Sequence, residues 1–218
     1  MTDTVTLAGI VLSSMPVGEA DRRLLLLTRE YGKISCFARG ARKPTSPLVG
    51  VSRPFSFGSF TIYPGRNSFS LQSAEISDYF EAITKDVSKT AYGSYFLELC
   101  SVFSHENLDG TALLKLLVLS LRALLNPHIP DALVRRIFEL RVLTEEGVAP
   151  EFHEGENGLS KSAAYALNYV EHAEPGKLFS FTVTEEVLSE MGQRIDPVLT
   201  DYVSRPLPAR EMLSVLTM

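Results

Sequence analysis

The sequence predicts an α+β fold in which a five-stranded β-barrel comes first and an α-helical bundle follows. Five β-like segments, separated by turns rich in Gly and Pro, occupy about the first 75 residues. From Ser77 onward, the spacing of apolar residues changes to the helical period. Short, sharply bent strands in so small a stretch favour a closed barrel of the OB type. We therefore expect a barrel domain over residues 1–80 and a helical domain over residues 81–218.

Turn residues set the boundaries of the predicted strands. The first strand ends where Pro16 and Gly18 turn the chain. The Leu-rich run after Arg22 would by itself fit a helix, but the turn that ends at Gly32 favours a β-hairpin. The apolar register changes sides at Gly58, which is typical of a β-bulge or corner. The predicted strands cover residues 5–14, 22–28, 33–39, 55–63 and 68–75, and residues 44–54 are expected to be irregular.

The third predicted strand has an apolar face and a basic face. Read with a period of two, Ile34, Cys36 and Ala38 point to one side, whereas Lys33, Ser35, Phe37 and Arg39 point to the other. An aromatic ring flanked by cations on a solvated face has little packing reason to be there, and a base could stack on it. An ordinary solvated strand with a partly covered Phe37 explains the pattern equally well, so both interpretations stay open.

More cations follow this strand. The chain turns at Gly40, and Pro44 then stops regular pairing. Cations that bind phosphates, together with a ring that stacks on a base, are what a platform for single-stranded nucleic acid needs. The candidate DNA-binding residues are Lys33, Phe37, Arg39, Arg42, Lys43, Arg53 and Arg66.

The rest of the chain reads as helices. A helical spacing of apolar residues runs over residues 86–104, and a second helix ends before Asn126-Pro127. A third follows Pro130 and ends at Gly147, and residues 148–158 are expected to form a loop. The second and third predicted helices cover residues 111–125 and 131–147, and the remaining ones cover residues 160–173, 185–193, 197–204 and 209–216. Together they predict a helical bundle.

Charge is divided unevenly along the chain. The net charge is −5, yet residues 1–80 carry nine Lys and Arg against six Asp and Glu, and the remaining 138 residues carry twelve against twenty. Basic character is therefore local to the predicted barrel. Both cysteines, Cys36 and Cys100, lie in apolar patterns, which favours reduced, buried thiols over a disulfide. No secretory signal or membrane span is visible, so we expect a soluble, cytoplasmic protein.

Six motifs follow one another at spacings that resemble the bacterial RecO family of recombination mediators, over most of the first 150 residues. They are Tyr31-Gly32-Lys33-Ile34, Arg39-Gly40-Ala41-Arg42-Lys43-Pro44, Pro54-Phe55, Tyr63-Pro64-Gly65-Arg66, Phe138-Glu139-Leu140-Arg141 and Glu146-Gly147-Val148-Ala149-Pro150.

The resemblance implies a non-enzymatic role in bacterial DNA repair and recombination. It implies binding of single- and double-stranded DNA, annealing of complementary strands, and assistance to RecA on strands coated by single-stranded DNA-binding protein (SSB), together with RecR. The family's basic barrel surface carries over to Lys33, Arg39, Arg42 and Lys43, with Arg66 in the adjoining turn. A nucleoid-associated, cytoplasmic location follows from the same resemblance.

The chain departs from the family after Pro150. Many members carry two Cys-x-x-Cys pairs there that hold zinc, whereas this region has no cysteine and only His153 and His172. A structural zinc site needs four nitrogen or sulfur donors, so we predict no zinc and no other cofactor. A weak His/Glu site is the less favoured alternative.

Other functions fit the residues less well. Cys100 near His105 suggests a thiol nucleophile, but Cys100 lies on an apolar helix stripe, where a thiol is inert. Nucleophile-elbow, nucleotide-binding and paired-carboxylate motifs are missing from the sequence, so we predict no enzyme activity. The main alternative is an OB-fold scaffold for protein interactions without intrinsic DNA binding.

The helical half also contains a candidate docking surface. Because this half is acidic, an acidic partner such as the tail of SSB would need clustered cations. Val118 and Leu121 are the expected apolar floor between those cations. The alternative is that the cations only solvate the outside of the bundle. The candidate partner-binding residues are Lys115, Arg122, Arg135, Arg136 and Arg141.

Overall fold

The computed structural model describes residues 4–65 and 68–216. Contacts divide the chain into a barrel unit, residues 1–81 and 97–114, and a helical unit, residues 82–96 and 115–218. Residues 97–114 are helical or looped and yet belong to the barrel unit, and the domain boundary after residue 80 stays a prediction. Among the described residues, no helix is both long and apolar enough to cross a membrane.

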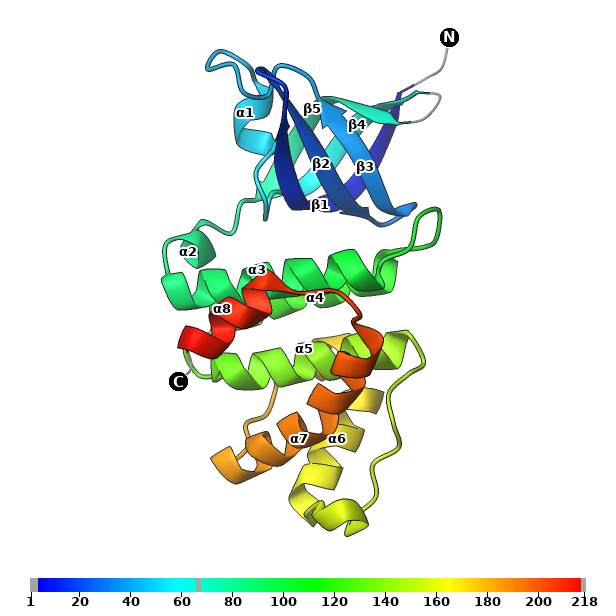
Figure 1. Cartoon of the computed structure of the whole chain (residues 1–218), viewed down its shortest axis with the longest axis vertical. Helices are drawn as coiled ribbons and strands as arrows, with labels where there is room; N and C mark the ends of the chain where they lie inside the picture. Colours follow the sequence, from blue (N-terminus) through cyan, green and yellow to red (C-terminus); the bar gives the residue numbers. More distant parts are fainter. Residues whose placement is uncertain (1–3, 66–67, 217–218) are drawn as a thin grey trace. The chain divides into compact units, whose positions relative to one another are not determined.

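In the described part of the chain, five strands close into a barrel in the order β1-β2-β3-β5-β4, and β4 pairs back to β1 (Figure 1). Neighbouring strands are antiparallel except β3 and β5, which are parallel. This barrel, followed by helices, confirms the predicted α+β fold with an OB-type barrel. The strands are β1 (Val5–Val17), β2 (Asp21–Thr28), β3 (Gly32–Ala38), β4 (Phe57–Pro64) and β5 (Phe69–Asp78).

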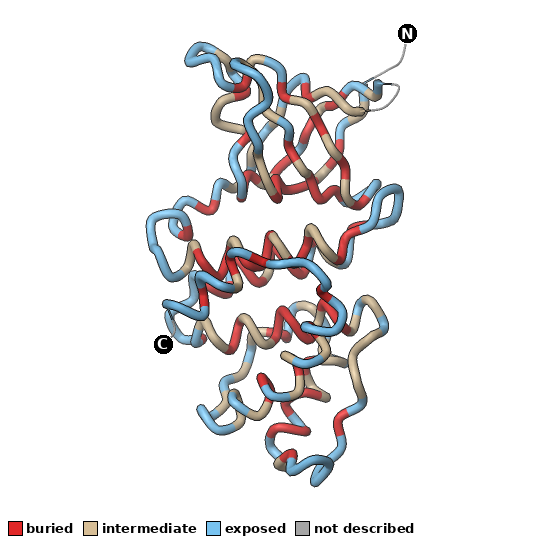
Figure 2. The backbone as a smooth tube through the Cα atoms, viewed as in Figure 1, coloured by how far each residue is buried: buried red, intermediate tan, exposed pale blue. Residues whose placement is uncertain are grey.

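The barrel core follows the alternation of the sequence. In β3, Ile34, Cys36 and Ala38 are buried, whereas Lys33 and Phe37 are only partly covered, which is the predicted alternation. Buried and more exposed positions alternate along the barrel strands (Figure 2). The side chains that fill the barrel are mainly branched aliphatics from all five strands, which suit a pleated and buried surface. They include Leu7, Val11, Leu24, Leu26, Phe60, Ile62 and Leu71.

Two bulges bend the pairing of β4 with β5. The register shifts once between Phe57 and Gly58, where the sequence predicts a corner, and again between Thr61 and Ile62. The second shift pairs Ile62 with Leu71 and Thr61 with Ser73, so Gln72 has no opposite residue. A bulge of this kind re-aims a side chain and increases local twist.

Helix α1 (Leu48–Val51) corrects the expectation of an irregular segment over residues 44–54. Its first residue, Leu48, is buried and belongs to the barrel core. A single turn of helix is too short to give a periodic pattern, so the sequence contains no signal for it. Helix α2 (Glu81–Thr84), whose Ile83 is buried, is also a single turn, so the sequence contains no signal for it either.

The loop between α3 (Val87–Phe103) and α4 (Thr111–Leu124) is bound to the β2–β3 hairpin. The amide of Lys33 donates to the carbonyl of His105 at 3.0 Å, and the amide of Gly110 donates to the carbonyl of Arg29 at 2.9 Å. A Cβ atom at Gly32 would lie 2.3 Å from the His105 oxygen, and Gly32 has a φ of +58°. Only glycine fits this position, because both the backbone conformation and the close approach exclude a side chain.

The helical unit is built on α5 (Asp131–Glu145), which packs against α6 (Lys161–His172) and α7 (Glu185–Tyr202). Helix α8 (Pro208–Leu216) follows, and short 3-10 turns occur at Glu156–Gly158 and Pro175–Lys177. Eight of the fifteen residues of α5 are buried, which makes it the centre of this unit.

Helix α7 corrects the prediction of two helices, residues 185–193 and 197–204. It runs unbroken from Glu185 to Tyr202 with Pro197 inside it. Proline removes one backbone donor and normally breaks a helix. Ile195 and Leu199, on either side of Pro197, are buried, and this packing holds the helix together across the lost hydrogen bond.

Candidate nucleic-acid interface

The outer surface of the barrel carries a groove of about 580 Å³, here called the barrel groove. Its walls come from β2, β3, the β4–β5 turn and the loop after α3, all within the barrel unit. Cations and aromatic rings both contribute to the walls, which is the combination that single-stranded nucleic acid requires. The lining residues are Arg23, Lys33, Ile34, Ser35, Phe37, Gly65, Ser68, Phe69, Glu106 and Asn107.

Phe37 is one of the two aromatic residues that line this groove. Strand pairing places it opposite Arg23 of β2 and opposite Ser70 of β5. Its ring is only partly covered and lies outside the barrel core, so the structure leaves an aromatic surface at the predicted position. Stacking of a base on this ring stays a prediction.

Arg23 is a groove residue that sequence reasoning missed. Its Nε donates to Ser35 Oγ at 2.8 Å across the β2–β3 pair, while the residue is exposed. One bond at Nε orients the guanidinium and leaves its other donors for an anion. The signal was present in the hairpin register, because pairing Thr28 with Gly32 places Arg23 opposite Phe37.

Lys33 is already engaged inside the barrel unit. Its Nζ donates to the carbonyl oxygen of Ser101 at 2.9 Å. Ser101 lies in the last turn of α3, where carbonyls lack helical partners and a cation stabilises the helix dipole. The side chain therefore ties β3 to α3, and its contact with DNA stays a prediction.

The other predicted cations are spread over the barrel. Arg42 is exposed, and its Nη1 donates to the carbonyl of Gly18 at 2.8 Å, which fixes it to the β1–β2 turn. Arg39 and Lys43 are exposed, and within the described ranges their side chains make no hydrogen bond or ion pair. Both are therefore available to bind a phosphate.

Two predicted residues lie apart from this set. Arg53 is exposed and precedes the start of β4, whereas Arg39 lines a hollow with Tyr63 at the end of that strand. Arg53 is therefore a strand length away from Arg39. Arg66 lies outside the described residues.

Phe69, Glu106 and Asn107 were also missed as lining residues. Phe69 is the first residue of β5 and packs against the barrel core. Glu106 and Asn107 reach the groove because the amide of Asn107 donates to the carbonyl of Tyr31 at 3.0 Å. No sequence pattern connects a loop with a strand about seventy residues before it.

Three of the five predicted docking cations have internal partners in the helical unit. Arg135 Nε donates to Glu139 Oε1 at 2.8 Å, and Arg136 Nη1 donates to Glu139 Oε2 at 2.8 Å. Arg141 donates to the carbonyl of Glu171 at 2.6 Å and to Glu145 Oε1 at 2.7 Å. An acidic partner would have to displace these carboxylates.

The expected apolar floor of that docking surface is not exposed. Val118 is 8% exposed and Leu121 is fully buried, because both contribute to the core of the bundle. Lys115 and Arg122 are exposed, and among the described residues their side chains have no ion pair. Docking at the five cations stays a prediction, and only these two are open to a partner.

Arg135 and Arg136 form an ion-pair network with Glu139 and Asp196, and the opposite charges of this network stabilise one another. Burial acts to lower the pKa of Arg136, but the Glu139 and Asp196 carboxylates more than compensate and raise it above its ordinary value. Burial, together with the Glu139 carboxylate, raises the pKa of Tyr95, whose hydroxyl donates to Glu139 Oε1 at 2.7 Å. Arg136 therefore stays charged and Tyr95 stays neutral at neutral pH.

Metal-binding groups do not gather anywhere in residues 4–65 and 68–216: no three His, Cys, Asp or Glu side chains lie close enough to hold an ion. Cys36 and Cys100 are free and buried, and burial raises the pKa of the Cys36 thiol to about 12. A protonated, buried thiol neither attacks nor ligates. His153 Nε2 lies 3.1 Å from Glu151 Oε2 on the surface.

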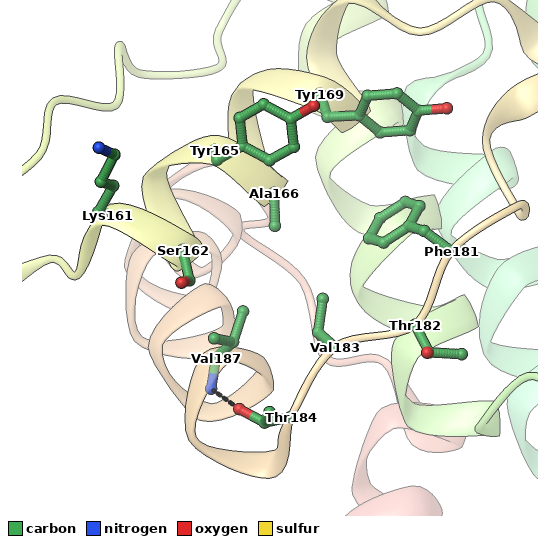
Figure 3. Close-up of a pocket in the computed structure, with 10 residues that line it drawn as sticks. All are labelled: Lys161, Ser162, Tyr165, Ala166, Tyr169, Phe181, Thr182, Val183, Thr184 and Val187. Carbon is green, nitrogen blue, oxygen red and sulfur yellow. Dashed lines mark hydrogen bonds between the residues drawn. The ribbon is translucent and has the colours of Figure 1, made fainter.

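A larger cavity, about 910 Å³, lies in the helical unit between α6 and the chain that enters α7 (Figure 3). Tyr165, which is 73% exposed, and the T-shaped pair Tyr169 and Phe181 form its apolar wall. Lys161 is the single cation among its lining residues. Without a set of cations, this cavity lacks the chemistry to bind a phosphate backbone.

Fold and groove together define the class: an OB-type barrel with a groove of cations and aromatic rings on its outer face, joined to a helical bundle. The family model "Recombination protein O N terminal" matches residues 1–80, and "Recombination protein O C terminal" matches residues 84–158. The chain belongs to the RecO family, and this membership supports a role in DNA repair.

Relatives in several bacteria agree with the family models. A DNA repair protein RecO of Acetivibrio thermocellus is 29% identical over 85% of this chain and 86% of its own length. Those of Bacillus pumilus and Bacillus subtilis are 37% and 36% identical, each over 66% of this chain and 56% of their own length. The match thus spans little more than half of the length of the Bacillus proteins.

Proposed function

We propose that this protein is a non-enzymatic recombination mediator that binds DNA through the barrel groove. It binds single- and double-stranded DNA, anneals complementary strands, and with RecR helps to load RecA on strands coated by SSB. The observation that carries the proposal is the position of Phe37 on the outer face of an OB-type barrel, opposite Arg23 and two residues before the exposed Arg39. A bacterial cytoplasmic location near the nucleoid fits this role.

The chemistry of the barrel groove and of the exposed barrel cations outside it suits annealing. Phosphates of a single strand are neutralised by Arg39 and Lys43, which have no ion pair within the described ranges, and by Arg23. A base that stacks on Phe37 presents its π-face to the protein and leaves its Watson–Crick edge unused. A bound strand can therefore still pair with its complement, with no covalent step and no cofactor.

Two protein partners belong to the proposal, RecR and the acidic tail of SSB. For the tail, Lys115 and Arg122 are the cations that remain open in the helical unit. Calorimetric titration with a short acidic peptide that ends in an apolar residue should show weaker binding to Lys115→Glu/Arg122→Glu. Undiminished binding to this variant would place the tail elsewhere.

The second candidate function is a scaffold for proteins without intrinsic DNA binding. The apolar cavity beside Tyr165 favours it, because a large exposed aromatic side chain is typical of protein-binding surfaces. Titration of a labelled oligo-dT strand at low and moderate salt separates the two functions. Phe37→Ala should weaken binding by about 1–3 kcal/mol, the usual contribution of one stacked base, and Phe57→Ala is the matched control outside the groove. Absence of binding to the wild type would leave the scaffold function.

A further inference from the structure

A second hollow of about 380 Å³ adjoins the barrel groove, and Gly65 and Ser68 line both. Arg39, Tyr63 and Gln72 are the charged, aromatic and amide side chains among its lining residues. Tyr63 lies at the end of β4 and is 38% exposed, although its neighbour Ile62 is buried in the barrel. Its ring is therefore on the outer face, as Phe37 is.

Strand register places the two rings in one row across the barrel. Phe37 of β3 is opposite Ser70 of β5, and Ser70 is opposite Tyr63 of β4. Neighbouring strands are about 4.8 Å apart, so two strand spacings separate the backbone positions of Phe37 and Tyr63 by about 10 Å. A base stacks at about 3.4 Å from each neighbour, so the two rings are too far apart to hold the two faces of one base, and each ring needs a base of its own. The residue between the rings in this row, Ser70, is small.

Gln72 and Arg39 complete this hollow. The bulge in β5 leaves Gln72 without an opposite residue, and Gln72 is exposed beside Tyr63. An amide both donates and accepts, so it can bond to the edge of any base. Continuing the parallel pairing of β3 with β5 places Arg39 alongside Gln72. A cation, a ring and an amide are thus gathered around one hollow.

We propose that this hollow is a second nucleotide subsite of the barrel, in which Tyr63 stacks on a base, Arg39 binds a phosphate and Gln72 bonds to the base edge. The inference rests on the proposed DNA-binding function. A single strand then crosses the barrel from the Phe37 subsite to the Tyr63 subsite, with one base stacked on each ring.

The test compares two probes, an oligo-dT strand of about ten nucleotides and an abasic strand of the same length, on wild type and Tyr63→Ser. Tyr63→Ser should bind oligo-dT about 5- to 140-fold more weakly and bind the abasic strand as the wild type does, because only a base can stack. Tyr63→Phe should restore binding. Tyr79→Ser, at a tyrosine that is 40% exposed just beyond β5, is the matched control and should change neither affinity.

The outcomes separate this inference from the proposed function. Equal loss on both strands, or no loss on either, overturns the Tyr63 subsite even when Phe37→Ala weakens oligo-dT binding. No binding of either strand to the wild type overturns both. Because the chain has no Trp, tyrosine dominates its intrinsic fluorescence, and oligo-dT should quench the wild type more than Tyr63→Phe.

Discussion

Arg136 of α5 joins Asp196 of α7 by two parallel hydrogen bonds, Nη1 to Oδ1 at 2.8 Å and Nη2 to Oδ2 at 3.0 Å. Arg210 also reaches Asp196, at 3.3 Å, and Arg136 reaches the fully buried Glu139. Helices α5, α7 and α8 are thus bridged by two acids, Glu139 and Asp196, and three arginines, Arg135, Arg136 and Arg210. Paired charges of this kind fix how the helices meet more than they add stability.

Removing the buried carboxylate should be severe. Glu139→Gln leaves Arg135 and Arg136 partly buried without their shared anion, and we expect the free energy of unfolding to fall by about 3–5 kcal/mol. Glu174→Gln, which removes an exposed pair with Lys177, should cost less than about 1 kcal/mol. Urea unfolding measures both, and equal losses would show that the network has no special role.

Gly192→Ala should reverse the usual effect of removing glycine from a helix. Alanine is normally about 1 kcal/mol better than glycine inside a helix. A Cβ atom at Gly192 would lie 2.6 Å from Arg136 Nη2, which its ion pairs hold in place. We expect a lower melting temperature for Gly192→Ala, and a higher one would contradict the close approach of this guanidinium to α7.

The buried thiols should make the protein unstable in alkali. Burial raises the pKa of Cys36 from 9.0 to about 12, and it also raises that of Cys100. Above about pH 9 the unfolded chain loses these protons and the folded chain keeps them, so stability is full below this pH and falls above it. Each thiol contributes a slope of about 1.4 kcal/mol per pH unit.

Cys36→Ala tests this slope. Between about pH 9.5 and 11, its free energy of unfolding should fall about 1.4 kcal/mol per pH unit less steeply than that of the wild type. The variant also loses packing in the barrel core at every pH, so the slope rather than the absolute value is compared. Identical slopes would mean that the Cys36 thiol titrates equally in both states.

Zinc should not contribute to the fold. Both thiols are buried and protonated, and the sequence after Cys100 has no further cysteine. Metal analysis of untagged protein should find less than one zinc per chain, and a chelator should leave the melting temperature unchanged. A stoichiometric zinc ion lost together with stability would refute this prediction.

Local sequence patterns predicted most of the barrel and of the helices, because hydrophobic periodicity and turn residues depend only on residues that are close together in the sequence. Inward Ile34 and Cys36, the corner at Gly58 and the long helices all follow from such patterns. The predicted helix break before Pro197 was wrong, because tertiary packing keeps the helix continuous across the proline. Residues 97–114 join the barrel unit through backbone bonds to the β2–β3 hairpin, which no composition or period encodes.

The site was less predictable than the fold. Alternation in β3 identified Phe37. The sequence alone does not show which cations already have partners in the folded protein and which are available to bind a phosphate. The structure binds Lys33 to α3 and Arg42 to a turn, and it leaves Arg39 exposed. Arg23 depended on the register between strands, since pairing alone places it beside Phe37.

The central claim is that cations on the barrel bind the phosphates of single-stranded DNA. The affinity for oligo-dT should fall with salt with a log–log slope of roughly −3, if about four phosphates are neutralised. Arg39→Gln/Lys43→Gln removes two exposed cations that have no ion pair within the described ranges, and it should make the slope less steep by about 1.4. Lys161→Gln/Lys177→Gln removes the same charge from the helical unit and is the matched control.

Measuring this slope for the wild type and the two double variants is the most direct test of DNA binding by the barrel. We predict a slope near −1.6 for Arg39→Gln/Lys43→Gln, because each of two lost phosphate contacts makes the slope of about −3 less steep by about 0.7, and an unchanged slope for the control. An unchanged affinity and slope in the barrel variant, or an equal change in both variants, would contradict binding of DNA by the barrel.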